Sequence, residues 1–579
     1  MLIRNNYNKK QNDMNTKKNA ILTALLFSAL GTYAGNNERG IDLYRAELYD
    51  AAKVFFVEQT NQSSEEQAEN LYYLGQTYSE LQQNDSAAYY YQKTIETAPE
   101  YPFGYIGEGK IALAKNDGKT AGDLFKKALS LAPKKDASIA TAIAEVYIHA
   151  EQYPQAEDAL SKAEKANKKY AGLFMARGDM ALQQNKPDQA YGWYEQAKYF
   201  DPNNKLAYLK LAKAYENTNS AASLDYLDQL IQIDPEYIPA YALIGDINRA
   251  SGKYGQALSA YEKFISIPGV PVLQHERYAQ LLYFTKQYQK SLDRIAYVLR
   301  YDPENPVMHR LQGYNHFELG ETALAAQELE QFLTNNPTDK HIYLDYITYG
   351  RALAKEKQSE KAIEILLKAA ELDPSKSEVY KELTTAYENQ KNYSKAIQYY
   401  QKYFETEQSP VSLDYYFYGQ ANYSAAAKYI APEYTATPVS PEQKVIDAAD
   451  FDTYIANGKG AFEEVIERSP NSYLGYLWLS NLHTLVDFKY QEVKGGAIQG
   501  VAKPYFEKAL EVMLANNEDG KRNKDIISAY NYLASYHMLR SDKFKEDAIS
   551  AGEYYKKIIE IDPSNADAKK ALDAMHIKY

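Results

Sequence analysis

One stretch of the chain has the glycine and lysine spacing of a phosphate-binding loop. Residues 104–110 read GYIGEGK, with glycines and a lysine at the P-loop positions. In that loop a Ser or Thr follows the lysine and binds magnesium, but Ile111 stands there, and no strand pattern precedes the stretch. Gly109 also falls in the small-residue slot of a helical repeat. We therefore interpret these glycines as packing residues and predict no cofactor.

Other residues that could do chemistry do not form a catalytic or metal-binding pattern. His275 and Glu276 are adjacent, but no second His follows at the spacing of a zinc peptidase. The acid pairs at 65–66 and 463–464 fall on expected solvated helix faces, whereas a glycosidase needs two carboxylates across a cleft. The chain has no cysteine, which excludes disulfides, thiolate-bound zinc and thiol nucleophiles. We predict a non-enzyme without catalytic or metal-binding residues.

Length and composition limit the class of protein further. The 579 residues are too many for one compact core. The chain holds 57 Tyr but only 2 Trp, and tyrosine can fill large packing positions while its hydroxyl stays near water. The net charge of −12 argues against a general nucleic-acid binder, which needs a basic face.

The elements that must position any site are paired helices, most clearly between residues 68 and 99. The first-helix face is marked by Leu71, Leu74, Gly75 and Tyr78, and the second-helix face by Ala87, Tyr91 and Thr94. Glycine weakens a helix, so Gly75 indicates close approach of the neighbouring helix. Pro99 follows the end of the pair.

This pattern recurs along almost the whole chain. Small residues mark the first helices and Ala-Pro, Asp-Pro or Asn-Pro endings follow the second helices, at a nearly constant period. Two stretches interrupt the period, at about 424–458 and 486–501. Residues 567–576 predict a closing helix with a polar outer face.

The repeat resembles the tetratricopeptide repeat, in which Trp-x2-Leu-Gly-x2-Tyr is followed by Ala, an aromatic residue and Pro within about 34 residues. Leu71 takes the Trp slot and Tyr91 the aromatic slot. The resemblance covers residues 40–579 and implies an all-α solenoid superhelix of about fourteen helical pairs, with inserts in the C-terminal repeats. It also implies binding of a protein or peptide partner in a concave groove.

The sequence predicts four segments. They are a signal peptide at 1–34, an N-terminal and middle array at 35–411, repeats with insertions at 412–563, and a capping helix at 564–579. Loops that interrupt a repeat often lie at the binding face, and simple loop growth is the alternative, because surface insertions cost little stability.

The N-terminus has the pattern of a secretory signal. Lys17 and Lys18 precede an apolar run from Ala20 to Leu30, and the small residues Thr32 and Ala34 follow. The run is too short to span a membrane comfortably, and no comparable run follows. We expect cleavage after Ala34 and a periplasmic protein without a membrane span. The true start is Met1 or Met14.

The groove can be located from the repeat register. A residue directly after a packed slot lies about 100° round the first helix from the packed face, and in the family that stripe lines the groove. In the middle repeats we predict a partner-binding surface with aromatic and arginine side chains, as favoured at protein interfaces. Its residues are Tyr283, Arg310, Tyr314, Phe317, Arg351, Tyr416 and Tyr423. The alternative is that a Tyr-rich chain places Tyr everywhere.

The functional hypothesis is an exported scaffold or adaptor that binds a partner protein or peptide and does no catalysis. The Lys and Asn pattern that clamps two carboxylates in some family members is not matched, because Tyr72 and Gln76 stand there. Two alternatives remain open: a glycan-binding envelope protein, and an enzyme that uses the C-terminal inserts. The sequence leaves the oligomeric state open.

The first prediction concerns export. We expect the mature protein to begin directly after Ala34, because a signal peptidase needs the small residues at Thr32 and Ala34. Mass spectrometry of the N-terminal peptide from the native organism measures this. A cytoplasmic protein that keeps Met1 or Met14 would contradict it.

Overall fold

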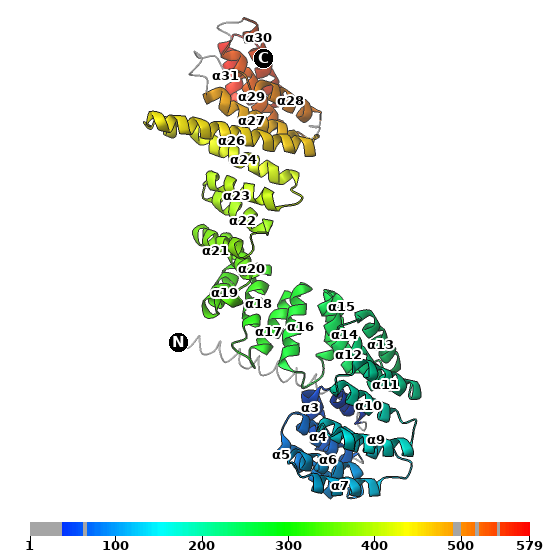
Figure 1. The fold of residues 1–579 in the computed structure, drawn as a ribbon. Helices are drawn as coiled ribbons and strands as arrows, with labels where there is room; N and C mark the ends of the chain where they lie inside the picture. Colours follow the sequence, from blue (N-terminus) through cyan, green and yellow to red (C-terminus); the bar gives the residue numbers. More distant parts are fainter. Residues whose placement is uncertain (1–36, 62–65, 490–498, 516–519, 541–544) are drawn as a thin grey trace, which may run out of the picture. The chain divides into compact units, whose positions relative to one another are not determined.

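The computed structural model describes residues 37–61, 66–489, 499–515, 520–540 and 545–579, and within these ranges all regular structure is helical. The helices pack as successive pairs, fourteen in the described ranges, with a closing helix at the end (Figure 1). This confirms the predicted all-α solenoid. The predicted signal peptide lies outside the described residues.

The chain divides into two compact units that meet within α18, the first ending at Leu311 and the second beginning at Gln312. The four segments predicted from the sequence stay a prediction. The first unit contains α2 (Glu38–Arg45), α3 (Tyr49–Thr60), α4 (Gln67–Glu80), α5 (Asn84–Thr97), α6 (Pro102–Ala114), α7 (Gly118–Leu131), α8 (Ser138–His149), α9 (Tyr153–Ala166), α10 (Ala171–Gln183), α11 (Pro187–Phe200), α12 (Lys205–Tyr215), α13 (Ser220–Ile233), α14 (Ile238–Ala250), α15 (Tyr254–Phe264), α16 (Val272–Phe284), α17 (Tyr288–Val298) and the start of α18 (Pro306–Glu318).

The second unit continues the same paired arrangement. Its helices are the rest of α18, α19 (Thr322–Asn335), α20 (Tyr343–Lys355), α21 (Ser359–Leu372), α22 (Ser377–Asn389), α23 (Tyr393–Thr406), α24 (Ser412–Ala427), α25 (Pro432–Thr435), α26 (Pro441–Arg468), α27 (Tyr473–Lys489), α28 (Lys503–Leu514), α29 (Asn523–Met538), α30 (Lys545–Ile561) and α31 (Ala566–Ala574), with short 3-10 turns at Thr338–Lys340 and Lys428–Ile430. In the ranges that the structure describes, no helix combines the length and apolar character that a membrane crossing needs.

The turn inside a pair repeats its backbone geometry. One residue there adopts a left-handed conformation, for example Asn116 with φ 60° and Asn185 with φ 58°. Asn and Gly tolerate this conformation better than other residues, so they stop the first helix at low cost. The second helix is then started by a side-chain cap in several repeats, as where Asp117 accepts the N–H of Thr120 at 3.0 Å.

In eight of the described pairs, a glycine of the first helix lies against a large side chain of the second helix. A Cβ added at Gly178 would lie 2.3 Å from Cε1 of Tyr194, and one added at Gly109 would lie 2.2 Å from Cε1 of Phe125. These distances are too short for any real contact, so a residue with a Cβ at either position would force the ring to shift. Gly109 and Lys110 lie within α6, which confirms that the loop-like sequence at 104–110 is helical packing.

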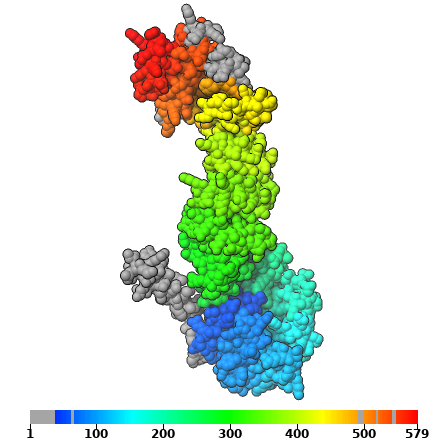
Figure 2. Space-filling view, turned by 90° about the vertical axis from the view of Figure 1, so that its left-hand side faces the viewer, coloured from blue at the N-terminus to red at the C-terminus, as the bar shows by residue number. Residues whose placement is uncertain are grey.

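The N-terminal helix pair closes the first unit against much later repeats. Leu43 and Phe56 share one apolar core with Ile238 of α14 and Leu281 of α16. Lys205 of α12 reaches α2, with its Nζ 2.6 Å from Asp42 and 2.8 Å from Glu38. In Figure 2 the blue N-terminal segment lies against green segments of the same unit.

A close backbone contact reinforces this closure. Gly269, between α15 and α16, has φ 78°, and a Cβ there would lie 2.8 Å from Cα of Ala51 in α3. Contacts between the ends of this unit are not predictable from the sequence, because no local pattern encodes them.

The two predicted inserts alter the second unit in different ways. In the first insert, α26 begins at Pro441, and Ser440 caps it by accepting the N–H of Gln443 at 3.1 Å. Phe462, further along α26, packs against Gly419 of α24 as the second-helix residue of the slot. The second insert lies partly outside the described residues. The end of this insert is held against α27 by the buried carboxylate of Asp487, which accepts the N–H groups of Gly500 at 2.8 Å and Val501 at 2.9 Å.

Replacing Gly178 tests the packing slot. We expect Gly178→Leu to lower the free energy of unfolding by about 1–3 kcal/mol, because the fully buried ring of Tyr194 cannot move aside. The control is Gly192→Leu on the exposed face of α11, where an added Cβ meets nothing within 4 Å. Chemical denaturation of both variants measures the difference, and equal stabilities would contradict the packing role.

Candidate functional site

The seven predicted partner-binding residues fall in both units. Tyr283 and Arg310 belong to the first unit and are half-buried. The ring of Tyr283 lies against those of Phe284 and Tyr288, with centroid distances of 5.6 and 5.8 Å. Whether all seven residues form one surface stays a prediction.

The other five predicted residues belong to the second unit, and the structure gives them unequal access. Tyr314 is only 4% exposed, and its hydroxyl donates to the carboxylate of Asp345 on the next first helix. Phe317 is half-buried with the Nζ of Lys355 4.6 Å above its ring. Tyr314 therefore contributes to packing between repeats, whereas Phe317 keeps part of its surface accessible.

Arg351 and the two later tyrosines are also half-buried. The Nε of Arg351 donates to Glu382 at 2.7 Å, and its Nη2 lies 3.2 Å from Glu378. Tyr416 and Tyr423 both pack edge-on to the indole of Trp478, with centroid distances of 6.1 and 5.3 Å. These two tyrosines lie on α24 and form an aromatic cluster with α27.

Polar side chains of successive first helices bind one another in a ladder along the inner face. Its rungs between basic and acidic side chains are Lys110 with Glu80 at 2.7 Å, Lys210 with Asp179 at 2.6 Å, Arg277 with Asp246 at 3.0 Å, Arg351 with Glu382 at 2.7 Å, and Lys381 with Asp414 at 2.6 Å. Each rung joins the first helices of neighbouring repeats. Charged side chains on the inner face therefore stabilise the packing of neighbouring repeats, in addition to any contact that they make with a partner.

A recess of about 440 Å³ lies on this inner face in the first unit. First helices α4, α6, α8, α10 and α12 form its wall, and the turn between α2 and α3 projects into it. The lining combines aromatic rings with charged groups of both signs. It includes Tyr44, Arg45, Glu47, Tyr49, Tyr72, Tyr73, Gln76, Glu80, Phe103, Glu145, His149, Tyr170, Asp179 and Lys210.

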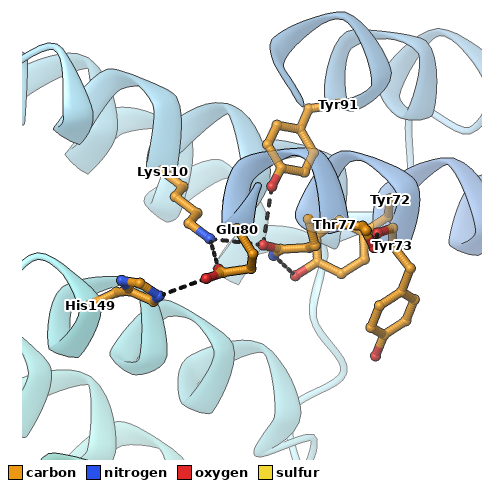
Figure 3. Close-up of polar contacts among 8 residues, drawn as sticks. Tyr72, Tyr73, Thr77, Glu80, Tyr91, Lys110 and His149 are labelled. Atoms are coloured by element: carbon orange, nitrogen blue, oxygen red, sulfur yellow. Dashed lines mark hydrogen bonds and ion pairs between the residues drawn. The ribbon is translucent and has the colours of Figure 1, made fainter. Parts of the chain in front are cut away.

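One wall of the recess is a closed hydrogen-bond network (Figure 3). Glu80 accepts from Lys110 at 2.7 Å and lies 3.2 Å from Nε2 of His149, so its carboxylate joins three first helices. Burial opposes ionisation, but His149 and Lys110 outweigh it and lower the pKa of Glu80 to about 2. The neighbouring Gln76 accepts from the hydroxyl of Tyr91 at 3.1 Å. This wall has its polar groups satisfied within the protein.

The opposite situation holds for Glu145 of α8. Its side chain is exposed to the recess, but the protein atoms that enclose the recess displace much of the surrounding water, and this desolvation raises the pKa of Glu145 to about 7. The carboxylate of Asp179 adds to the rise, while Arg45 and Lys210 act against it. Among the described residues, Glu145 has neither a hydrogen-bond nor an ion-pair partner.

Sequence reasoning missed this recess although its register rule applies there. Gln76, Glu145 and Asp179 each directly follow a small slot residue, as the predicted groove residues do in later repeats. The rule was used only for the middle repeats. The contribution of Arg45 has no such signal, because it depends on the closure of the unit by α2 and α3.

Acidic side chains and a histidine line the recess, but they are not grouped as metal ligands. Within the described ranges, no three His, Asp or Glu side chains are grouped so that they could hold a metal ion. Asp179 is already engaged by Lys210 at 2.6 Å and by the hydroxyl of Tyr194 at 2.7 Å. The arrangement is suited to binding charged and aromatic groups.

Sequence comparison identifies the repeat itself. Family models described as tetratricopeptide repeat match residues 69–101, 141–205, 206–237, 238–269, 279–340 and 346–376. The chain belongs to the tetratricopeptide repeat family. The matched segments lie in both units and coincide with helical pairs, so this assignment and the packing slots agree.

Solved structures similar to this tetratricopeptide repeat protein come from several bacteria. One is the C-terminal part of a TPR repeat-containing protein from Cytophaga hutchinsonii, with 25% identity over 51% of this chain and 99% of that chain, and a TM-score of 0.38. Another is Pseudomonas aeruginosa pilF, with 18% identity, 37% and 97% coverage, and a TM-score of 0.30. A third, from Parabacteroides merdae, has 13% identity, 50% and 99% coverage, and a TM-score of 0.23.

The raised pKa of Glu145 predicts a pH effect on stability. Between its ordinary value of 4.5 and about 7, the folded state keeps a proton that the unfolded state loses, so rising pH costs stability at this residue. We expect Glu145→Gln to raise the melting temperature, relative to wild type, more at pH 8 than at pH 5. Thermal unfolding at both pH values measures this.

The matched control is Glu96→Gln, the same substitution on the exposed surface of α5. A gain from Glu145→Gln that is equal at pH 5 and pH 8 would contradict the assignment of a raised pKa.

Proposed function

We propose that this chain is an exported, non-catalytic scaffold that binds a partner protein or peptide on the inner faces of its first helices. Tetratricopeptide arrays typically act as interaction scaffolds, because stacked repeats present an extended surface that a single repeat lacks. The basic and apolar pattern from Lys17 to Ala34 supports export, and we propose the periplasm as the location.

The observation that carries the proposal is the aromatic cluster on α24 and α27. Tyr416 and Tyr423 are partly accessible and pack edge-on against Trp478. Phe417, next to them, is 40% exposed. Trp and Tyr are enriched among the residues that dominate binding energy at protein interfaces, since their rings give contact area at low entropic cost.

Site-specific photo-crosslinking in the native organism tests this assignment. A crosslinking amino acid at Phe317 or Tyr423, both on first helices, is expected to capture the same partner. The control is Tyr199 on second helix α11, whose side chain is 76% exposed. Capture only at Tyr199, or different proteins at the two inner positions, would contradict an inner binding face.

The captured partner then allows a measurement of affinity. We expect the double substitution Tyr416→Ala, Tyr423→Ala to weaken binding by about 1–4 kcal/mol, as for interface hot spots, and Tyr199→Ala to leave it unchanged. Isothermal titration with purified partner measures both, and circular dichroism checks that each variant remains folded. Unchanged affinity in the double variant would overturn the role of the cluster.

A further inference from the structure

Two acidic residues of the first unit show how the array satisfies a carboxylate on its inner face. Asp179 and Asp246 each directly follow a small slot residue. The tyrosine 15 residues later donates its hydroxyl to each of them at 2.7 Å. The basic residue 31 positions later forms an ion pair with each of them. Two donors from fixed repeat positions therefore satisfy such a carboxylate.

Glu145 stands at the same position, after Ala144, but lacks both donors. Leu160 takes the place of the tyrosine and Ala176 the place of the basic residue, and both are fully buried. Neither side chain can donate a hydrogen bond. The repeat thus leaves Glu145 as a carboxylate whose hydrogen bonds must come from water or from a ligand.

The opposite charge in the recess comes from the N-terminal closure. Arg45 ends α2, and its guanidinium has one hydrogen bond to another described residue, a 3.5 Å contact from Nη2 to the hydroxyl of Tyr73. Five donor groups on a planar cation can bind a carboxylate through two parallel hydrogen bonds. Arg45 and Glu145 both line the recess.

The other charged groups of the lining are already engaged. Glu80 is held by Lys110, Asp179 by Lys210, and Glu47 by Lys213 at 3.1 Å. Aromatic rings, including Tyr72 and Tyr170, cover much of the remaining wall. The volume of about 440 Å³ suits a small molecule and is too small for a folded domain.

We propose that the recess of the first unit binds a free zwitterion with an amino-acid backbone, an amino acid or a short peptide, with its ammonium group on Glu145 and its carboxylate on Arg45. The aromatic walls favour an aromatic or apolar side chain on this ligand. The proposed binding goes beyond the scaffold function, because it uses the first unit alone and requires no partner protein.

The raised pKa of Glu145 agrees with this assignment. A carboxylate that is partly desolvated and has no protein donor is more costly to ionise than one in bulk water, and an arriving ammonium group supplies an opposite charge and hydrogen bonds. The groups that face it are Asp179 on α10, Arg45 on α2, Lys210 on α12 and Lys110 on α6. The three basic groups lower the pKa of Glu145, but they do not outweigh desolvation and the charge of Asp179.

Isothermal titration of the purified full chain tests the proposal. The probes are phenylalanine, alanyl-phenylalanine and alanyl-alanyl-phenylalanine, which separate an amino acid from a short peptide. We expect at least one to bind. Its N-acetyl form, which lacks the ammonium, and its amide form, which lacks the carboxylate, should each bind wild type about tenfold more weakly or worse, as for loss of a charged hydrogen bond.

Substitutions assign the two ends. Glu145→Gln should weaken the zwitterion but leave the N-acetyl form unchanged, and Arg45→Gln should weaken the zwitterion but leave the amide form unchanged. The matched control is Glu108→Gln on α6, a half-buried carboxyl that does not line the recess. Melting curves report whether each variant folds, and the blocked probes test wild type independently of the variants.

Several results would overturn the proposal. Absence of heat with all three probes at millimolar concentration would do so, as would blocked forms that bind wild type as well as the zwitterion does. In either case Arg45 and Glu145 would be solvated charges of the recess that bind no such ligand. Because this experiment contains no partner protein, its failure is distinct from failure of the scaffold function.

Discussion

Where the first helix has a slot glycine, a large side chain of the second helix fills the space that the glycine leaves, and this contact holds the pair together. Tyr194 fills the space over Gly178, and Tyr261 does the same over Gly245. The two rings are fully buried, yet their hydroxyls reach Asp179 and Asp246 on the inner face. One residue therefore fixes both the packing of a pair and the hydrogen bonding of the surface that faces a ligand. Where Leu160 replaces the tyrosine, packing is kept and the hydrogen bond is lost.

The closure of the first unit adds a constraint that no single repeat contains. Lys205 forms ion pairs with Glu38 and Asp42, which precede it in the sequence by more than half of the unit's length. Leu43 and Phe56 pack in the same apolar core as α14 and α16. Burial raises the pKa of Asp42 even though Lys205 pairs with it, so the contact lies deep enough to exclude much water. Because of this contact, α2 places Arg45 on the inner face. In the other repeats, the inner face is formed by side chains of their own first helices.

The fold was predictable because its determinants are local. Spacing within about one repeat length is enough to place the slot at Gly178 and its filler Tyr194, and the number of pairs follows by repetition. The same register also places Glu145 on the inner face, and its missing donors can be found by counting 15 and 31 residues onward. The recess was not predictable, since contacts such as Lys205 with Glu38 join residues whose separation bears no relation to the repeat.

The burial of Tyr314 shows why an exposed stripe cannot be deduced from register alone. The position directly after the slot residue directs a side chain toward the inner face. Side chains of the neighbouring first helix can then bind it, so that it is no longer available to a ligand. Asp345 accepts a hydrogen bond from Tyr314, and Glu378 and Glu382 form ion pairs with Arg351. A residue in the stripe remains available to a ligand only where the next repeat offers no complementary group. Ala176 makes Glu145 such a case, because it offers no donor to that carboxylate, so the departures from the repeat consensus carry the information about binding.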